Sequence, residues 1–149
     1  MSKELDMRFI TEDIDYFPQR GSSSAAGYDL KACLIEDEVL IWPHQTAKIN
    51  TGIKIAIPEH YCGLILPRSG IASKEGLRPA NTPGLIDSDY RGDIIVALHN
   101  DSNEVRKVTR GERIAQLVII PFMEIHFKPV DDLDETDRGE GGFGSTGTK

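Results

Sequence analysis

The 149-residue sequence predicts an all-β domain, either a sandwich or a barrel, and two observations lead to this fold class. Apolar side chains alternate with polar ones along several short segments, which is the pattern of a strand with one buried face. Turn residues separate these segments about every eight to twelve positions, a spacing typical of sandwiches and barrels. A sustained 3.6-residue periodicity, the mark of a long amphipathic helix, is absent from the sequence.

The clearest alternation lies between Ala47 and Ile57, and Pro58 ends this predicted strand. Isoleucines stand at positions 49, 53, 55 and 57, so one face of the strand is buried. The best candidate for a helix is the short stretch Ser69–Glu75. The other predicted strands are Arg8–Ile10, Tyr28–Leu34, Val39–Trp42, Cys62–Leu66, Asp93–Asn100 and a long run from Arg113 to Phe127.

The chain divides into a β domain over residues 1–128 and a flexible C-terminal arm over residues 129–149. The arm is acidic at first and then rich in glycine, with few apolar side chains. Five of the ten residues from Arg138 to Gly147 are glycine. Because glycine loses the most backbone entropy on ordering, we expect this arm to hold no fixed shape by itself.

The charge of the chain narrows the choice of ligands. The net charge is −7, and six acids stand against two bases from Asp131 onward. Nucleic acids are poor candidates as partners, because their binding depends on many lysines and arginines that neutralise phosphates. A small anionic ligand needs only a few well-placed donors or a metal ion, so this class stays open.

We expect an intracellular protein, cytoplasmic or nuclear, with no membrane association. The sequence has no run of roughly 20 apolar residues, and its N-terminus lacks the apolar core of a signal peptide. Cys33 and Cys62 are too few for a disulfide framework, so we expect free thiols in a reducing compartment. The four histidines show no metal-ligand spacing.

The segment Pro67–Gly70 has the composition of a small anion site. Ser69 is a good residue type for the N-cap of the helix that follows, and Arg68 stands beside it. The N–H groups at a helix start, together with an arginine, attract anions. Taken alone, this tetrapeptide favours the simpler interpretation, a turn whose serine caps a helix and whose arginine is solvated.

The segment Pro83–Gly92 carries more information. Two glycines bracket Asp87, Asp89 and Tyr90, which predicts a hairpin that projects these three side chains. A carboxylate beside a phosphate can orient a water molecule and take its proton, and a tyrosine ring can pack on a sugar. Ordinary turn chemistry is the alternative interpretation.

Two further polar residues stand in apolar surroundings. Gln116 interrupts the apolar run that starts at Arg113, so a buried Gln116 amide needs partners, or it reaches a ligand oxygen. Asp29 follows a flexible glycine, and three roles are open to it. It caps a turn, pairs with an arginine, or holds metal-bound waters.

Taken together and in this order, five segments resemble the five motifs of trimeric deoxyuridine triphosphatases (dUTPases). These segments are Ala26–Leu30, Pro67–Gly70, Gly84–Gly92, Gly111–Leu117 and Arg138–Gly147. The resemblance extends from about residue 8 to residue 147, nearly the whole chain. The departures lie between motifs, as in residues 78–83.

The resemblance implies a jelly-roll β-sandwich that forms a homotrimer with active sites shared between subunits. It implies hydrolysis of dUTP to dUMP and pyrophosphate, which limits uracil in DNA and supplies dUMP for dTMP synthesis. By position, Asp87 activates the water that attacks the α-phosphorus, and Tyr90 lies under the deoxyribose and excludes a 2′-hydroxyl. Gly84 and Leu85, with Asn81, read the edge of the uracil.

The remaining implied roles concern the phosphates, the metal and the arm. Arg68, Ser69 and Gly70 bind phosphates from a neighbouring subunit, and Gln116 adds a donor. Mg²⁺ binds to the triphosphate, and Asp29 contacts the ion through water molecules. The arm closes over the substrate, where Phe143 stacks on the uracil and Arg138 pairs with the γ-phosphate. Gly144, Ser145 and Thr146 supply further donors.

Three alternatives stay open at this point. The nearest is a dCTP deaminase, which is similar in fold and shares parts of the motifs. The second is a catalytically silent protein that binds a nucleotide or a partner on the same scaffold. The third is a purely structural jelly roll, such as a capsid protein.

Overall fold

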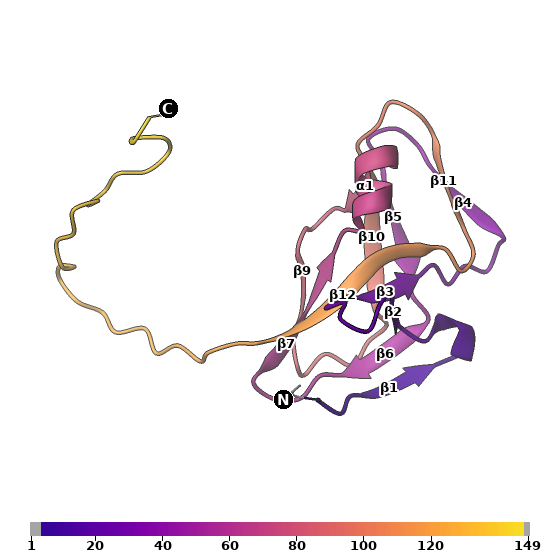
Figure 1. Ribbon diagram of the computed structural model, residues 1–149, viewed down its shortest axis with the longest axis horizontal. Helices are drawn as coiled ribbons and strands as arrows, with labels where there is room; N and C mark the ends of the chain where they lie inside the picture. The colour runs from indigo at the N-terminus through magenta and orange to yellow at the C-terminus, as the bar shows by residue number, and fades with distance from the viewer. Residues whose placement is uncertain (1–3, 148–149) are drawn as a thin grey trace.

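The alternating segments of the sequence become antiparallel strands in the computed structural model, which describes residues 4–147 (Figure 1). The strands are β1 (Arg8–Thr11), β2 (Gln19–Arg20), β3 (Tyr28–Lys31), β4 (Glu38–Ile41), β5 (Thr46–Asn50), β6 (Ile53–Ala56), β7 (Tyr61–Leu66), β8 (Leu77–Pro79), β9 (Gly84–Ile86), β10 (Ile95–Asn100), β11 (Arg106–Thr109) and β12 (Arg113–Pro121). The helices of this part of the chain are a 3₁₀ turn, η1 (Ile14–Tyr16), and one α-helix, α1 (Ser69–Glu75). The fold is therefore all-β with a single short α-helix among residues 4–147.

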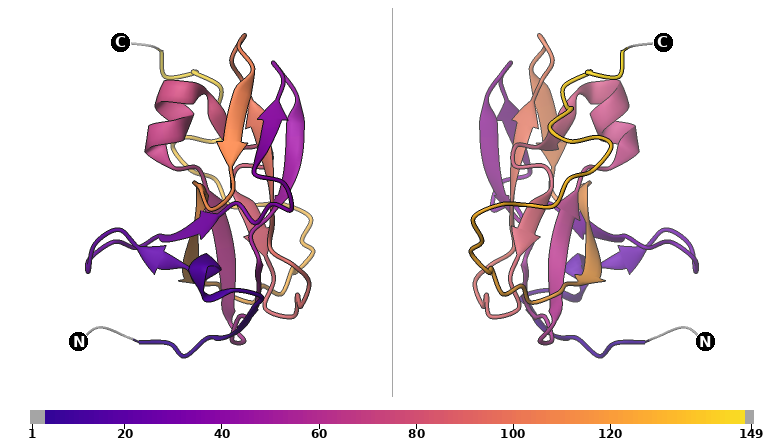
Figure 2. Two further views of the ribbon diagram at one scale, coloured as in Figure 1. Left: turned by 90° about the vertical axis from the view of Figure 1, so that its right-hand side faces the viewer. Right: turned by 90° about the vertical axis from the view of Figure 1, so that its left-hand side faces the viewer.

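The strands form a β-sandwich of jelly-roll type. Five of them make the largest sheet, in the order β2-β3-β12-β7-β9, and the others pair as β5-β10-β8, β4-β11 and β1-β6. Leu30 and Ile114 from the largest sheet join Ile49 and Leu98 from the β5-β10-β8 sheet in one buried apolar cluster. Figure 1 and Figure 2 both place α1 at the end of the body where β4 and β11 lie.

The strand predicted over 47–57 is two strands in the structure. β5 pairs with β10, whereas β6 pairs with β1 in another sheet. The break lies at Gly52, whose φ of +73° favours glycine, and its N–H donates to Asn50 Oδ1 at 2.8 Å. A Cβ at position 52 would stand 3.0 Å from the Tyr16 ring, so the side chain of any other residue would also collide there.

Other predicted boundaries differ because strand length depends on pairing partners. β12 ends at Pro121, where it pairs with Tyr61 at the first residue of β7, so the predicted extension to Phe127 is wrong. β2, β8, β9 and β11 were not predicted, since each is short and depends on a neighbouring strand. The predicted helix Ser69–Glu75 is confirmed with both of its boundaries.

Residues 122–147 form neither helix nor strand and extend away from the sandwich (Figure 1). Local turns shape the last part of this segment, such as the one in which the Arg138 Nε donates to Gly141 O at 2.8 Å. The division at residue 128 stays a prediction. Among residues 4–147, the helices are too short to cross a membrane.

Candidate functional site

The first candidate pocket lies where β3, β12 and the start of α1 meet. Its volume is about 210 Å³. Five of the predicted site residues line it, together with Gly21, Ala25 and Gly27. The five are Asp29, Arg68, Ser69, Gly70 and Gln116. Residues from three separate motifs of the sequence therefore surround one cavity.

Strand register explains how the pocket brings Asp29 and Gln116 together. On β12, Gln116 stands opposite Asp29 of β3 on one side and opposite Leu66 of β7 on the other. The Gln116 Nε2 donates to Pro67 O at 2.9 Å, so the amide has a partner within the chain. A Cβ at position 27 would stand 2.1 Å from Gln116 Oε1, which means that only glycine leaves room for this amide.

Asp29 pairs with two arginines, one of the three roles that its sequence context left open. Its Oδ1 accepts from Arg68 Nε at 2.8 Å, and its Oδ2 lies 3.4 Å from Arg113 Nη1. The Asp29 side chain is 13% exposed. The Arg68 Nη1 donates to Arg113 O at 3.3 Å, so contacts within the chain hold Arg68 at the rim of the pocket and leave its Nη2 for a ligand.

The prediction that Ser69 caps α1 is wrong. The N-cap residue is Arg68, in extended conformation and without a capping side chain, and Ser69 is the first helical residue. The Arg68 side chain therefore does not cap the first N–H groups of α1, and Ser69 and Gly70 line the pocket. A Cβ at position 70 would meet nothing within 4 Å, so packing within residues 4–147 gives no reason for a glycine there.

The second candidate pocket lies beside β9 and holds the residues of the predicted catalytic loop. Its volume is about 200 Å³, and Leu85, Asp87, Tyr90 and Asp93 are among the residues that line it. The segment is not the hairpin that the sequence suggested. β9 pairs with β7, and the chain then continues as a loop until β10 begins at Ile95.

Local contacts hold this loop in shape. Tyr90 N donates to Asp87 O at 3.2 Å, and the Tyr90 hydroxyl donates to Asp93 O at 3.0 Å. Arg91 Nη1 donates to Ser88 O at 2.6 Å. A Cβ at position 92 would stand 2.4 Å from the Tyr90 hydroxyl, so Gly92 makes room for the ring. The Asp87 side chain is exposed at the wall of the pocket.

Asn81 lies close to β9 but does not line either pocket. A Cβ at position 84 would stand 3.4 Å from Asn81 Nδ2, so the amide lies beside the Gly84 backbone. Arg138, Phe143, Gly144, Ser145 and Thr146 belong to the segment after β12, which extends away from the sandwich (Figure 1), and they line neither pocket. Phe143 is fully exposed. Within one chain, the structure thus separates the arm residues from the sandwich residues.

The two pockets share no lining residue and lie far apart. Ile86 of β9 stands opposite Gly63, so Asp87 leaves the sheet near the beginning of β7, whereas Arg68 follows the end of β7. β7 has six residues, and at about 3.3 Å per residue the separation along the strand is roughly 20 Å. One copy of the chain therefore does not bring Asp87 and Arg68 to the same ligand.

Sequence reasoning missed several residues that shape these pockets. Gly27, Gly92 and Arg113 act through contacts with Gln116, Tyr90 and Asp29, as the structure shows. All three residues lie within the motifs that the sequence analysis singled out. The roles of Gly27 and Arg113 could not be predicted because their partners, Gln116 and Asp29, lie on other strands, and the role of Gly92 depends on the fold of its own loop.

The structure defines an antiparallel β-sandwich protein with two separate pockets, each of which has charged side chains in its lining. Residues 15–147 match the family model described as dUTPase. The chain belongs to the dUTPase family.

Named relatives and solved structures agree with this family. The chain is 46% identical over 148 residues to the deoxyuridine 5'-triphosphate nucleotidohydrolase of Hahella chejuensis, covering 99% of this chain and 95% of the relative. It is 46% identical to the protein of the same name from Pseudomonas entomophila, with coverage of 99% and 97%.

Among solved structures, a variant of the Staphylococcus bacteriophage 80alpha dUTPase with dUpNHpp superposes with a TM-score of 0.83. The two are 30% identical, and the match covers 96% of this chain and 99% of the phage chain. A mutant dUTPase from phage phi11 of S. aureus, whose description names the coordination of a structural Mg(II) ion, has a TM-score of 0.73 at 26% identity. That match covers 86% of this chain and 98% of the phage chain.

Proposed function

We propose that this protein hydrolyses dUTP to dUMP and pyrophosphate, with Asp87 as the general base. The observation that carries the proposal is the exposed Asp87 carboxylate beside Tyr90 in a cavity of about 200 Å³, in a chain that belongs to the dUTPase family. Relatives carry the name of this activity, and a structural neighbour binds a dUTP analogue.

Asp87 takes a proton from the water that attacks the α-phosphorus. A carboxylate does this when it stands within hydrogen-bond reach of the water, and such general-base catalysis contributes a factor of about 10²–10⁴. Tyr90 presents its ring to the deoxyribose, and the hydroxyl bond to Asp93 O holds that ring in place. A ribose 2′-hydroxyl finds no room against the ring, which favours dUTP over UTP.

The base is read by the backbone of Gly84 and Leu85, with the Asn81 amide beside them. β9 is the last strand of the largest sheet and pairs only with β7 among residues 4–147, so its outer backbone edge can face a ligand. Hydrogen-bonding groups that match uracil leave cytosine with unpaired donors, and unpaired buried groups are strongly unfavourable.

The phosphates are bound in the other pocket, by Arg68, the N–H groups of Ser69 and Gly70, and Gln116. Arginine forms paired hydrogen bonds with phosphate oxygens. The two arginine contacts of Asp29 keep Arg68 oriented before the ligand arrives. Since Gln116 uses its Nε2 on Pro67 O, it also fixes the chain that leads to Arg68.

A homotrimer with shared sites accounts for the separation of the pockets. A second copy of the chain is needed to bring an Arg68 pocket to an Asp87 pocket, because the two lie roughly 20 Å apart along β7 in one copy. Large apolar side chains that follow β12 are exposed in the single chain and are suited to burial between copies. These are Phe122, Met123, Ile125, Phe127, Val130 and Leu133.

The arm acts as a lid that a bound triphosphate orders. Phe143 stacks on the uracil, and Arg138 pairs with the γ-phosphate. Gly144, Ser145 and Thr146 add donors. Because the arm stands away from the sandwich in the single chain (Figure 1), substrate enters and product leaves while the arm is open. Water is excluded when the arm closes, which strengthens every charge interaction inside the site.

A Mg²⁺ ion bound together with the substrate would neutralise negative charge on the phosphates. Residues 4–147 contain no group of three or more His, Cys, Asp and Glu residues able to hold a metal ion. Both Asp29 oxygens already accept from arginines, so Asp29 fits contact with the ion through water and not direct coordination.

Both cysteines carry free thiols, which supports the proposed intracellular location.

The test is pyrophosphate release from dUTP compared with dCTP, dTTP and UTP. We expect dUTP to be turned over far faster than the other three nucleotides, and we expect Asp87→Asn to keep dUTP affinity while kcat falls by a factor of about 10²–10⁴. Unchanged turnover in Asp87→Asn would eliminate the mechanism. Ammonia release from dCTP would instead identify a deaminase, and dUTP binding without turnover in the wild type would identify a silent binding protein.

A further inference from the structure

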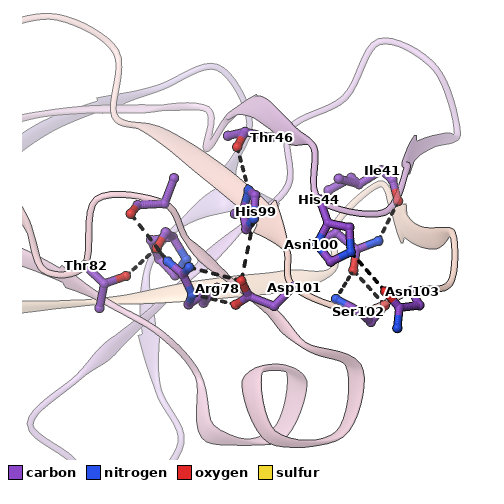
Figure 3. Close-up of polar contacts among 12 residues, drawn as sticks. Ile41, His44, Thr46, Arg78, Thr82, His99, Asn100, Asp101, Ser102 and Asn103 are labelled. Atoms are coloured by element: carbon purple, nitrogen blue, oxygen red, sulfur yellow. Dashed lines mark hydrogen bonds and ion pairs between the residues drawn. The ribbon is translucent and has the colours of Figure 1, made fainter.

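Arg78 lies at the centre of a polar network outside both pockets (Figure 3). It stands on β8 directly opposite His99 of β10. Its Nε donates to Asp101 Oδ2 at 2.6 Å, and its Nη2 donates to Asp101 Oδ1 at 3.1 Å. Both carboxylate oxygens are therefore held by the planar fork of one arginine, a geometry that lysine does not reproduce.

Asp101 is itself fixed in place. Its N–H donates to Gly76 O, at the end of α1, at 2.8 Å. Its Oδ1 also lies 3.5 Å from His99 Nε2, and His99 Nδ1 contacts Thr46 Oγ1 at 2.8 Å (Figure 3). Asp101 thus gives the Arg78 guanidinium a rigid support at the junction of α1, β8 and β10.

The third nitrogen of Arg78 reaches the chain that follows β8. Its Nη1 donates to Pro79 O at 3.3 Å and to Ala80 O at 3.4 Å. The Thr82 hydroxyl also donates to Pro79 O. Each of the two Arg78 contacts is long and weak alone, but together they hold successive carbonyls of one loop, residues 79–83.

This loop carries Asn81 to the backbone of β9. Ala80 N donates to Ala97 O at 2.7 Å, which ties the beginning of the loop to β10. Asn81 Nδ2 then lies close to Gly84, as the 3.4 Å distance to a Cβ built there indicates. The orientation of Asn81 depends on the course of the loop between these two points.

We propose that Arg78, supported by Asp101, is a positioning residue that fixes loop 79–83 and so sets the selectivity of the site for uracil over cytosine. The inference rests on the proposed function, because it assigns the base-reading role to Asn81 and Gly84. Arg78 touches no substrate in this role and acts through the loop.

A positioning role and a purely structural role predict different measurements. The side chains of Arg78 and Asp101 are 39% and 45% exposed, and ion pairs exposed to this degree contribute little to stability. A structural role therefore predicts small effects that are equal for all substrates. A positioning role predicts a change in KM and in base selectivity at a nearly constant melting temperature.

The experiment measures pyrophosphate release from dUTP and dCTP by Arg78→Ala. We expect KM for dUTP to rise about tenfold and the ratio of kcat/KM for dUTP over dCTP to fall about tenfold, because misplacement of a binding group weakens binding. We expect kcat to stay within about twofold, since Asp87 lies on a separate loop. The matched control is Lys107→Ala, which removes a similarly exposed pair with Glu38 at 3.3 Å and should change none of these values.

Two further variants keep the proposal open to refutation. Arg78→Lys retains the charge and loses the fork, so it should resemble Arg78→Ala. The double variant of Arg78→Ala and Asp101→Ala should be no worse than the first alone, because the two residues act as a unit. Wild-type KM and selectivity in Arg78→Ala, or strictly additive effects in the double variant, would overturn the proposal. If Arg78→Ala does not fold, the test uses Arg78→Lys and Asp101→Asn, with KM for dUTP and the ratio of kcat/KM for dUTP over dCTP as the measured quantities.

Failure of the proposed function has a different signature. A wild-type protein that releases no pyrophosphate from dUTP contradicts the function itself. In that case, calorimetric binding of dUTP and dCTP to the wild type and to Arg78→Ala still tests the loop. Equal dUTP-to-dCTP affinity ratios in the two proteins would then reject the positioning role.

Discussion

Substitution of Gly27 by alanine tests whether the position of Gln116 controls the phosphate pocket. The added Cβ would stand 2.1 Å from Gln116 Oε1, 3.0 Å from its Cδ and 3.3 Å from its Cβ. The end of the amide can rotate away, but its first carbon is fixed to β12. Gly27→Ala therefore displaces the Gln116 amide and breaks its hydrogen bond to Pro67 O, which is 2.9 Å long.

The magnitude follows from these two effects. The lost hydrogen bond lowers the free energy of unfolding by about 1 kcal/mol. Crowding against the fixed part of Gln116 adds about 1 kcal/mol, at the low end for overpacking because the rest of the side chain is flexible. For a chain of this size, the sum of about 2 kcal/mol lowers Tm by roughly 6 °C. Since Pro67 directly precedes Arg68, we also expect KM for dUTP to rise about tenfold.

The assay combines thermal unfolding with steady-state pyrophosphate release. Gly21→Ala is the matched control, because Gly21 lines the same pocket and an added Cβ there meets nothing within 4 Å. The double variant with Gln116→Ala removes the collision, so Gly27→Ala should then lower Tm no further than Gln116→Ala alone. A Gly27→Ala protein with the Tm and KM of Gly21→Ala would refute the reasoning.

Three other predictions follow from particular contacts. Deletion of residues 138–149 should leave Tm and assembly by size-exclusion chromatography nearly unchanged while kcat/KM for dUTP collapses; full activity would reject the lid. Gly92→Ala places a Cβ 2.4 Å from the Tyr90 hydroxyl, so the ring should shift and UTP turnover should rise relative to dUTP. The Arg78 hydrogen bond lowers the pKa of Asp101 from 3.8. Its contribution to stability is thus present above pH about 4 and is lost as pH falls through the lower folded pKa, so the Tm difference between wild type and Asp101→Asn should shrink as the pH falls below about 4.

The strands that the sequence predicted well are short apolar runs with polar or turn residues on both sides. β7 and β10 were predicted close to their observed bounds, because Pro67 follows the first run and Asp101 follows the second. β2 and β8 have only two and three residues, so their strand character comes from the neighbours with which they pair. The break between β5 and β6 at Gly52 could not be predicted, because glycine is compatible with both a continuous strand and a left-handed turn.

For the candidate site as well, some features could be predicted from the sequence and others could not. The types of residue that bind phosphate or activate water were recognisable in the motifs, since glycine, arginine and aspartate have distinct local chemistry. The ion pairs of Asp29 with Arg68 and Arg113 span 39 and 84 residues of sequence, so no local pattern predicts them. The N-cap of α1 was assigned one residue too late for a similar reason. Capping depends on backbone angles that the turn after β7 sets.

By itself, the sequence determined the all-β class, the single short helix and the family, because alternation and motif order are properties of neighbouring residues. Only the tertiary structure decided which strands pair, and with them the placement of Gln116 between Asp29 and Pro67. It also decided that Asp87 and Arg68 stand at opposite ends of β7. The reason is that strand register is chosen by packing across the whole sandwich, where each contact joins segments that are remote in the chain.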